Sequence, residues 1–574
     1  MFKRSVRAVL YAAARSQGAV LLRQFRAATR SVASAQRTVL AEVLAQQADS
    51  EMGRQLGLGR IGDPETLRRR LPITTYEDVR PFINRMRDTG DTTVMFGSGE
   101  RLLMFALTSG SDAEPKHIPV TAESHARYRR GWSTWVAQST IDHRRSLKHH
   151  VLPIVSSSVE RTTKHGVPCG SMSGLSTETQ SRFVRTIYAA PPALYGIRNQ
   201  AEKYYSLARW AVSMPVSFLV TANPSSFLLL AKVMDQRAQD LIRDIRDGSL
   251  STDWHSEGDR LLDEVAALRP DPRRAHFLES VLERTGHLYP KDVWPELGLI
   301  TNWKGGTLGH YLDLYAEPFG GTPVRDIGLL ASEGRMTIPM SDAGSAGPLD
   351  LFSHFYEFMP VEEESTSQPA TLLAHELEAG RQYYILLTNF SGLHRYNISD
   401  VIEVVDFMEQ CPVVRFLHKG SRFSSITGEK LSEHQVSTAV HAAACELGWK
   451  ITDFMLVPVW GEPPCYTLIT GRGSLGPRDA WPRLLERVER QLQTSNIEYE
   501  CKRRSMRLGH LRLGLVDDSH FESLRHERIT ASGGRAEQYK PTYLTPDLEY
   551  HRRLTIHEEV TVDDEREPAP MVSP

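Results

Sequence analysis

Hydroxyl, glycine and lysine residues cluster in one short segment of the chain, Thr108–Lys116. The apolar run 102–107 directly before it predicts a buried strand, so the segment falls on the turn where strands commonly present ligands. Amides in such a turn can form a concavity for anions, and a glycine lets the backbone approach a phosphate closely. We interpret the segment as a phosphate-binding loop in which Lys116 supplies charge and the contacts come from Thr108, Ser109, Gly110 and Ser111. The alternative is a solvated turn, because these are ordinary turn residues.

Two carboxylates further along the chain have the chemistry to complete a nucleotide site. Glu333, with Ser332 before it, is predicted to lie just past a buried strand and beside a glycine. A glutamate there offers the hard oxygen ligand that magnesium takes when it accompanies ATP phosphates. Asp400 is predicted to lie between two strands, where its oxygens could accept both ribose hydroxyls. The alternative for each is an acid that caps a turn.

Two basic segments occur in the last third of the chain. Arg422 lies in a turn where the character of the sequence changes, and we interpret this turn as a hinge, the alternative being a solvated linker. Lys540 follows a glycine-led segment, 533–539. A lysine on a movable small domain can be brought onto a phosphate only during the reaction. The catalytic candidates are therefore Lys540, Lys116 and Glu333.

Composition excludes several classes of protein. The chain has 574 residues, 40% of them apolar, which predicts several structural units. Its 68 basic and 70 acidic residues leave a net charge of −2, so no global charge favours nucleic acid as a partner. The five cysteines form no CxxC pair, which disfavours a zinc ribbon and a secreted disulfide framework and favours the cytoplasm. Region 210–234 is too broken for a spanning helix and predicts a buried strand followed by a core helix.

The two ends of the chain differ in charge. Residues 1–41 carry eight Lys or Arg and no acid, with apolar residues at helical spacing, so we predict a basic amphipathic helix over 1–40. We favour a helix that packs on the main domain over a mitochondrial presequence or a membrane-surface helix. Residues 555–574 hold six acids, one arginine and three prolines, and they predict a disordered acidic tail.

Strands alternating with helices predict a mixed α/β architecture. The expected strands and helices are the following: strands at 151–155, 216–221, 383–388, 401–405, 414–418, 453–459 and 466–470, and helices at 433–447 and 481–492. The elements after residue 420 predict a compact second domain.

The order of these segments resembles the acyl-activating adenylate-forming superfamily, the luciferase-like enzymes whose phosphate loop reads T-S-G-T-T-G-x-P-K. A closer resemblance is to the Gretchen Hagen 3 family of auxin-responsive acyl acid-amido synthetases. That family carries an A-S-S-E segment, G-L-Y-R-Y-R-V-G-D, Q-Y-K and V-P-V-V-T-Y-E-D. The similar segments here are Leu330–Glu333, Gly392–Asp400, Gln538–Lys540 and Leu71–Asp78, and Trp303–Gly306 is similar to its W-T-G-G.

This resemblance implies an adenylate-forming fold. It implies a large N-terminal domain of β-α-β layers and a β-barrel over 41–418, which binds ATP and the acid, and a small mobile α+β C-terminal domain over 419–554. The resemblance spans roughly residues 40–550 and follows the family's order of motifs.

The resemblance also implies an activity. Such an enzyme uses ATP and magnesium to convert a carboxylic acid into an acyl-adenylate and pyrophosphate, and then transfers the acyl group to an amine, usually that of an amino acid. By carry-over, Lys116 and Lys540 offset the charge of the phosphates, and Glu333 holds magnesium or lies near the α-phosphate. Asp400 binds ribose, and Arg422 lies at the hinge.

The chain departs from the family pattern at several positions. Asp112 stands where the wider superfamily has a small hydroxyl residue, which adds negative charge near the proposed phosphates. Ala113 and Ser399 each replace a glycine, and the family's K-T-P-R becomes Lys540–Tyr543.

Two other functions remain as alternatives. The acyl group could be passed to coenzyme A, or the chain could be a non-catalytic binding protein that contacts membrane surfaces through its N-terminal helix. The identity of the acid and the amine is left open.

Overall fold

The structure is a computed structural model that describes residues 2–108, 116–252, 261–363, 366, 369–419, 423–424, 426–427, 429, 431–504, 506, 508–531 and 541–561. The described residues divide into two compact units between Phe416 and Leu417. The predicted hinge was placed a few residues later, at 419–422. Each unit has its own hydrophobic core, and the two are considered separately below.

A four-stranded parallel sheet forms the α/β layer of the first unit. Its order is β3 (His150–Ile154), β6 (Val216–Thr221), β7 (Leu299–Asn302) and β8 (Val324–Asp326). Side chains alternate across it. Leu219 and Ile300 pack towards α9 (Gln200–Val212), α10 (Ser225–Gln236) and α11 (Ala238–Asp247), whereas Phe218 and Leu299 pack with Trp135 of α6 (Ala122–Asp142). A sheet covered on both faces agrees with the apolar character of these strands.

Two further sheets of the first unit share a core. The mixed sheet has the order β2 (Lys116–Thr121), β1 (Leu102–Thr108), β5 (Pro168–Gly170) and β4 (Arg161–Thr162). The antiparallel sheet has the order β11 (Gly347–Pro348), β16 (Cys411–Lys419), β15 (Tyr396–Met408), β14 (Gln382–Asn389), β12 (His354–Pro360) and β13 (Leu372–Leu373). Phe105 and Ile118 of the first sheet belong to the same buried cluster as Tyr356 and Ile385 of the second. The predicted mixed α/β fold is confirmed.

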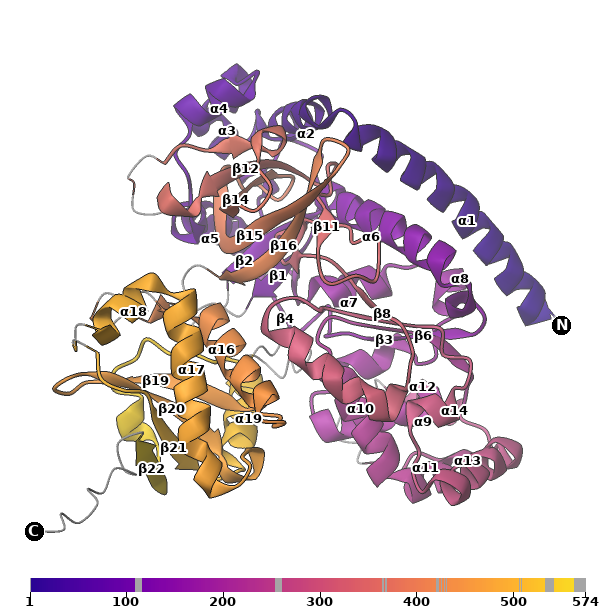
Figure 1. The fold of residues 1–574 in the computed structure, drawn as a ribbon. Helices are drawn as coiled ribbons and strands as arrows, with labels where there is room; N and C mark the ends of the chain where they lie inside the picture. The colour runs from indigo at the N-terminus through magenta and orange to yellow at the C-terminus, as the bar shows by residue number, and fades with distance from the viewer. Residues whose placement is uncertain are drawn as a thin grey trace, which may run out of the picture. The chain divides into compact units, whose positions relative to one another are not determined.

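Fifteen α-helices are described in the first unit (Figure 1). Their bounds are as follows: α1 Phe2–Thr29, α2 Val32–Gln47, α3 Glu51–Leu56, α4 Pro64–Arg70, α5 Tyr76–Thr89, α6 Ala122–Asp142, α7 Met172–Glu178, α8 Arg182–Arg185, α9 Gln200–Val212, α10 Ser225–Gln236, α11 Ala238–Asp247, α12 Leu262–Ala266, α13 Pro272–Thr285, α14 Pro290–Val293 and α15 Ala316–Phe319. The apolar region 210–234 forms β6 and most of α10, as predicted.

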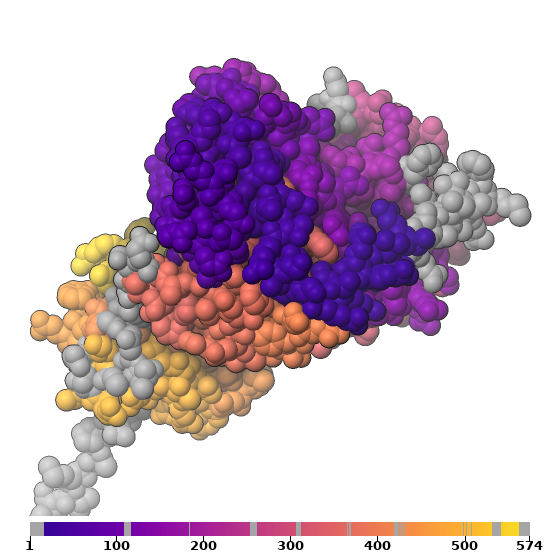
Figure 2. Space-filling model, turned by 90° about the horizontal axis from the view of Figure 1, so that it is seen from above, coloured from indigo at the N-terminus to yellow at the C-terminus, as the bar shows by residue number. Residues whose placement is uncertain are grey.

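The basic N-terminal segment forms two helices instead of one. Helix α1 ends at Thr29, and α2 runs across the expected boundary at residue 40 because its Val39, Leu40 and Val43 are buried in a core cluster. The described part of α1 packs on α6 (Figure 1). Phe25 of α1 is buried beside Trp135 of α6. Figure 2 shows the indigo N-terminal segment on the surface of this unit.

The second unit is an α+β domain. Its sheet has the order β19 (Phe454–Val459), β20 (Cys465–Gly471), β21 (Arg512–Val516) and β22 (Glu558–Thr561), and a small hairpin pairs β17 (Phe423–Ser424) with β18 (Leu431–Ser432). Its helices are α16 (Glu433–Glu446), α17 (Trp481–Ser495), α18 (Ile497–Arg504) and α19 (His520–Ala531). Helices α16 and α17 pack on the sheet through one apolar cluster.

The expected disordered tail begins too early. Residues Glu558–Thr561 form β22, which pairs with β21 in antiparallel register. The acidic side chains do not prevent pairing because Glu559 lies 3.4 Å from Arg512 across the two strands, and Val560 packs against the core. Residues 562–574 lie outside the described part of the chain.

Across the described residues, no helix is long and apolar enough to span a bilayer.

Candidate functional site

The two ends of the proposed phosphate loop are neighbours in the sheet. Thr108, the last residue of β1, pairs directly with Lys116, the first residue of β2. The loop therefore starts and ends at one point, at the rim of an antiparallel pair. Ser109, Gly110 and Ser111 lie outside the described residues, as does the unexpected Asp112.

An aromatic ring holds the lysine at the loop's end. The Lys116 ammonium lies 5.4 Å from the centroid of the Tyr76 ring, a cation–π contact. The buried Tyr76 hydroxyl accepts a hydrogen bond of 2.9 Å from the main-chain N–H of His117. Burial raises the pKa of Tyr76, so its ring stays neutral. Tyr76 is the first residue of α5, whose start is fixed by a capping box between Thr75 and Asp78.

The segment before α5 lies against the segment that carries Asp400. The main-chain N–H of Thr74 donates to the carbonyl of Arg395 at 3.0 Å, and that of Asn397 donates to the carbonyl of Thr74 at 2.8 Å. The Thr74 hydroxyl also donates to the His394 carbonyl at 2.7 Å. Two sequence motifs separated by some 320 residues, the lead-in and the one ending at Asp400, are therefore held side by side.

Tyr396 lies close to both candidate carboxylates. It is buried, and its pKa is raised by that burial and by the nearby charges of Glu333 and Asp400. The nearby Tyr76 contributes in the same direction. Lys116, Tyr76, Tyr396, Glu333 and Asp400 thus lie close together, and we call this group the tyrosine-bridged site.

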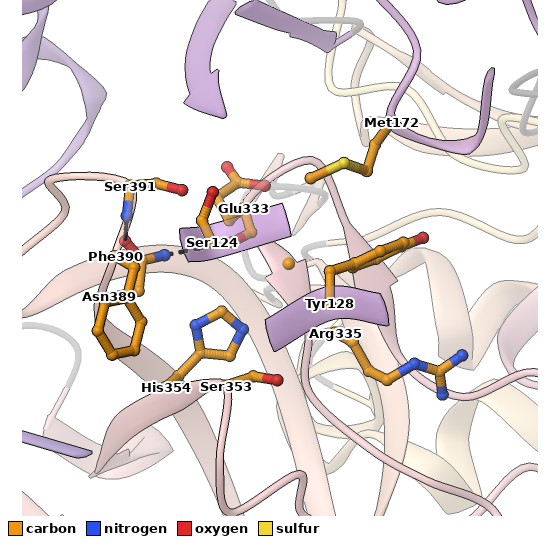
Figure 3. Close-up of a pocket in the computed structure, with 11 residues that line it drawn as sticks. Ser124, Tyr128, Met172, Glu333, Arg335, Ser353, His354, Asn389, Phe390 and Ser391 are labelled. Carbon is orange, nitrogen blue, oxygen red and sulfur yellow. Dashed lines mark hydrogen bonds between the residues drawn. The ribbon is translucent and has the colours of Figure 1, made fainter. Parts of the chain in front are cut away.

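Glu333 occupies a tight turn, a more specific position than the one predicted. Ser332 and Glu333 are the two turn residues of a hairpin between β9 (Leu330–Ala331) and β10 (Gly334–Arg335), and both side chains are half-buried. The side-chain amide of Asn389 donates to the main-chain oxygen of Glu333 at 3.2 Å. Figure 3 shows Asn389 and Glu333 on the same wall of a pocket.

The prediction that Asp400 lies between two strands is wrong. Asp400 lies within β15, where Ile398–Asp400 bulge out opposite the single residue Ile385 of β14. Ser399, in this bulge, has a φ of 60°, the left-handed region that favours glycine. The bulge turns the buried Asp400 side chain out of the regular alternation of the strand.

The carboxyl ends of β7 and β8 support the hairpin. The main-chain N–H of Lys304 donates to Asp326 at 2.6 Å, and the Trp303 indole donates to the Gly328 carbonyl at 2.9 Å. Burial raises the pKa of Asp326 to about 7, although the main-chain N–H groups of Lys304 and Gly328 act in the opposite direction. This edge of a parallel sheet is where ligands bind in open α/β folds.

A small cavity lies beside Glu333. Its walls come from α6, α7, the β9–β10 hairpin, the start of β12 and the segment 389–391 (Figure 3). Its volume is about 10 Å³, enough for a group the size of one water molecule.

Several predicted residues cannot be placed. Arg422 and Lys540 lie outside the described residues, and of Thr108 only the backbone is described.

In the parts of the chain that the structure covers, no three His, Cys, Asp or Glu side chains gather as a metal site. A magnesium ion held by one glutamate and the nucleotide phosphates needs no such cluster, and the half-buried Glu333 carboxylate suits that role.

Sequence reasoning missed four residues of this region. Tyr76 and Tyr396 stand inside the quoted motifs, so their position was available as a signal. Asn389 directly follows the predicted strand 383–388, and this position at a strand end was its only signal. His354, which lines the cavity, has no signal in the sequence.

The fold matches that of known amide-forming ligases. A solved structure described as GH3.15 acyl acid amido synthetase aligns with a TM-score of 0.81, covers 94% of this chain and 96% of its own, and is 21% identical. The fold is therefore of the acyl acid amido synthetase type.

Family models then cover most of the sequence. The GH3 family N-terminal domain matches residues 21–324, the GH3 family central domain matches 348–419, and the GH3 family C-terminal domain matches 434–549. This chain belongs to the GH3 family.

Plant relatives match over nearly their full length. Jasmonoyl–L-amino acid synthetase JAR6 of Nicotiana attenuata is 24% identical and is aligned over 91% of this chain and 92% of its own. Indole-3-acetic acid-amido synthetase GH3.3 of Arabidopsis thaliana is 23% identical, with 89% of each chain aligned.

Proposed function

We propose that this protein is an ATP-dependent acyl acid amido synthetase. It adenylates a carboxylic acid and then joins the acyl group to the amine of an amino acid, because its relatives are named for such products. The observation that carries the proposal is the tyrosine-bridged site, in which Lys116, Glu333 and Asp400 lie around Tyr76 and Tyr396.

The first step is a displacement at phosphorus. A carboxylate oxygen of the acid attacks the α-phosphorus of ATP, the bond to the β-phosphate oxygen breaks, and pyrophosphate leaves. An anion approaches a polyanion in this step, so catalysis consists of charge compensation and alignment. Lys116, held over Tyr76, supplies fixed positive charge where β1 and β2 meet. Lys540 supplies the second charge when the C-terminal domain brings it to the phosphates.

Two carboxylates orient the nucleotide. Asp400 accepts the ribose hydroxyls, and its place in a bulge supports a role that needs a side chain out of register. Glu333 would hold magnesium, which, when bound, neutralises charge on the phosphate oxygens. The Tyr396 side chain lies beside Glu333, and Asn389 fixes the backbone of the glutamate's turn. Ser332 is a further phosphate contact, and Arg422 acts at the hinge.

The second step breaks the acyl-adenylate. The amine nitrogen attacks the acyl carbon, AMP leaves with the bonding electrons, and the nitrogen loses a proton to give the amide. The cavity beside Glu333 supports an acid site between α6 and the β9–β10 hairpin, because it adjoins the proposed position of the α-phosphate.

Two alternative hypotheses differ from this proposal, one in the product formed and one in the class of protein. Coenzyme A as the acceptor would give a thioester from the same adenylate. A non-catalytic protein that contacts membrane surfaces through residues 1–40 is disfavoured, because Leu22 and Phe25 of that segment are buried. A cytoplasmic location is supported by the cysteines, since Cys169, Cys411, Cys445 and Cys465 are free thiols.

Exchange of labelled pyrophosphate into ATP tests the proposal. A broad panel of carboxylic acids is supplied one at a time, and at least one acid is expected to drive exchange. Mass spectrometry of the product, with amino acids or coenzyme A as acceptor, separates the two ligase readings. Lys540→Ala is expected to lower exchange by orders of magnitude while the protein still folds. If no acid in the panel drives exchange, both enzyme hypotheses are rejected.

A further inference from the structure

The cavity beside Glu333 has polar walls, and most of its polar side chains already have partners. The Ser124 hydroxyl donates to the Thr121 carbonyl at 3.1 Å and accepts from the Thr121 N–H at 2.9 Å. The Ser353 hydroxyl donates to Asp350 at 2.6 Å. Asn389 accepts from the Ser391 N–H at 2.9 Å, while its amide donates to the Glu333 carbonyl. These groups hold the cavity's walls and have little capacity left for a ligand.

His354 differs from those groups. Its residue is 3% exposed, and neither ring nitrogen makes a hydrogen bond to a residue that the structure describes. Figure 3 shows the ring standing between Phe390 and the β9–β10 hairpin, on the side of Ser124 and Glu333. A buried polar group without a partner costs free energy, so a ligand that supplies one recovers it.

Gly334 makes room for this ring. A Cβ atom at position 334 would lie 2.4 Å from Cε1 and 2.5 Å from Nε2 of His354, closer than any side chain allows. Its φ of 143° also lies in the region that favours glycine. The hairpin that carries Glu333 is thus shaped so that a nitrogen edge of the imidazole reaches the cavity.

The imidazole is uncharged at neutral pH. Burial lowers the pKa of His354 to about 3, although proximity to the Arg335 main chain acts in the opposite direction. A neutral imidazole has one N–H donor and one nitrogen acceptor. This pair suits a hydroxyl group, which also donates and accepts, better than a group that only accepts.

Size and charge narrow the ligand further. A cavity of about 10 Å³ admits one hydroxyl and is too small for a second carboxylate. The Glu333 carboxylate, which also lines the cavity, would repel a second anion, whereas the Arg335 guanidinium extends away from the cavity (Figure 3).

We propose that His354 is a specificity-determining residue that hydrogen-bonds an uncharged hydroxyl group of the acid substrate, so the protein selects a hydroxylated carboxylic acid. This inference rests on the proposed adenylating function. A site that hydrogen-bonds a substrate hydroxyl discriminates strongly against the analogue that lacks it, because the protein's polar group is then left unpaired.

The test compares matched pairs of acids, each with and without one hydroxyl, at different positions on aromatic and aliphatic acids. Pyrophosphate exchange gives kcat/KM for each acid, and the measured quantity is the ratio of hydroxylated to unsubstituted acid. We expect a ratio above about 100 for at least one position of the hydroxyl. His354→Phe keeps the ring size without nitrogens and should lower that ratio at least about tenfold. His354→Gln keeps a donor and an acceptor and should retain more of the ratio than His354→Phe.

His394→Phe is the matched control. His394 is also buried, its Nε2 also has no hydrogen-bond partner among the described residues, and it does not line the cavity. The ratio should be the same in this variant as in the parent. If His354→Phe does not fold, the comparison of His354→Gln with His394→Phe carries the test.

Several results would overturn the inference. A parent enzyme that adenylates acids without preferring a hydroxyl, or a preference that survives in both His354 variants, contradicts it while leaving the proposed function intact. A different result is that the parent prefers ATP over 2′- or 3′-deoxy-ATP and that His354→Phe loses this preference. This result would assign the hydrogen-bonded hydroxyl to the ribose of ATP and would contradict the inference. If none of the acids drives exchange, both the inference and the proposed function are overturned.

Discussion

The side-chain amide of Asn389 donates a hydrogen bond of 3.2 Å to the main-chain oxygen of Glu333, so the end of β14 holds the turn that presents the proposed magnesium ligand. The Asn389 side-chain oxygen meanwhile accepts from the N–H of Ser391 at 2.9 Å. One side chain therefore fixes both the hairpin turn and the segment that follows β14.

Replacement of Asn389 should lower kcat/KM by more than the accompanying loss of folding stability explains. Asn389→Ala leaves buried main-chain groups unpaired, which costs about 1–3 kcal/mol in the free energy of unfolding. Displacement of the Glu333 turn should also lower kcat/KM about 100-fold. Asn199→Ala, which removes the cap that accepts from the N–H of Glu202, is the control: it should cost about 1 kcal/mol and leave kcat/KM unchanged. Equal losses of kcat/KM in both variants would show that Asn389 acts only through stability.

The contact between Lys116 and Tyr76 predicts a graded effect on ATP binding. Tyr76→Phe keeps the ring under the ammonium, whereas Tyr76→Leu removes it. A cation–π contact of about 0.5–1 kcal/mol corresponds to a rise of about 2- to 5-fold in the KM for ATP when the ring is lost. In steady-state kinetics at saturating acid, the KM for ATP should therefore be higher for Tyr76→Leu than for the parent and for Tyr76→Phe. Identical values for the two variants would mean that the ring does not position the lysine.

Ser399 predicts an unusual gain in stability. Its φ of 60° is costly for any residue with a Cβ, by about 1–2 kcal/mol, while a glycine adds about 0.5–1 kcal/mol of backbone entropy to the unfolded chain. Ser399→Gly should therefore raise the free energy of unfolding by about 0.5 kcal/mol, measured by urea denaturation. The family pattern noted above has glycine at this position. A destabilised variant would contradict the strained geometry of the bulge.

Buried neutral histidines predict loss of stability in acid. Burial lowers the pKa of His125 and His394 to about 4 and that of His354 to about 3, compared with about 6.5 in an unfolded chain. Between pH 6.5 and 4 the unfolded state binds protons that the folded state does not, so stability falls as the pH falls through this window. Each histidine contributes at most about 1.4 kcal/mol per pH unit.

Urea unfolding at pH 7.5 and pH 5 measures this effect. The parent should lose more stability between the two values than His394→Phe does, because that variant lacks one of the three groups. A parent whose stability is equal at both pH values would mean that these histidines are charged in the folded state.

The sequence predicted the elements well where apolar runs are uninterrupted. Strand 216–221 has the bounds of β6, and helix 433–447 matches α16 to one residue, because each is a single buried run between clear turn signals. The disordered tail was predicted too long because the acidic residues of β22 indicated disorder in spite of the apolar Val560. The pairing of β22 depends on β21, a strand some 45 residues earlier. Such a partner is not visible in the local composition.

The site was predicted in parts but not as a connected set. Glu333 and Asp400 were found from their residue type and context, whereas Tyr76 and Tyr396 acquire their role only when β15 lies beside the start of α5. His354 reaches the cavity because Gly334 leaves space, a relation between residues of two different strands. Long-range packing of this kind has no periodic signature in a single sequence.

Transfer of oxygen from the acid to AMP tests the central claim most directly. An acid that supports exchange is labelled with ¹⁸O in its carboxylate and incubated with ATP, magnesium, the protein and an amine acceptor, and the AMP is analysed by mass spectrometry. Attack of the carboxylate on the α-phosphorus predicts AMP that carries one ¹⁸O atom, together with pyrophosphate and the amide. Unlabelled AMP, or the formation of ADP and phosphate in place of AMP, would contradict an acyl-adenylate at the tyrosine-bridged site.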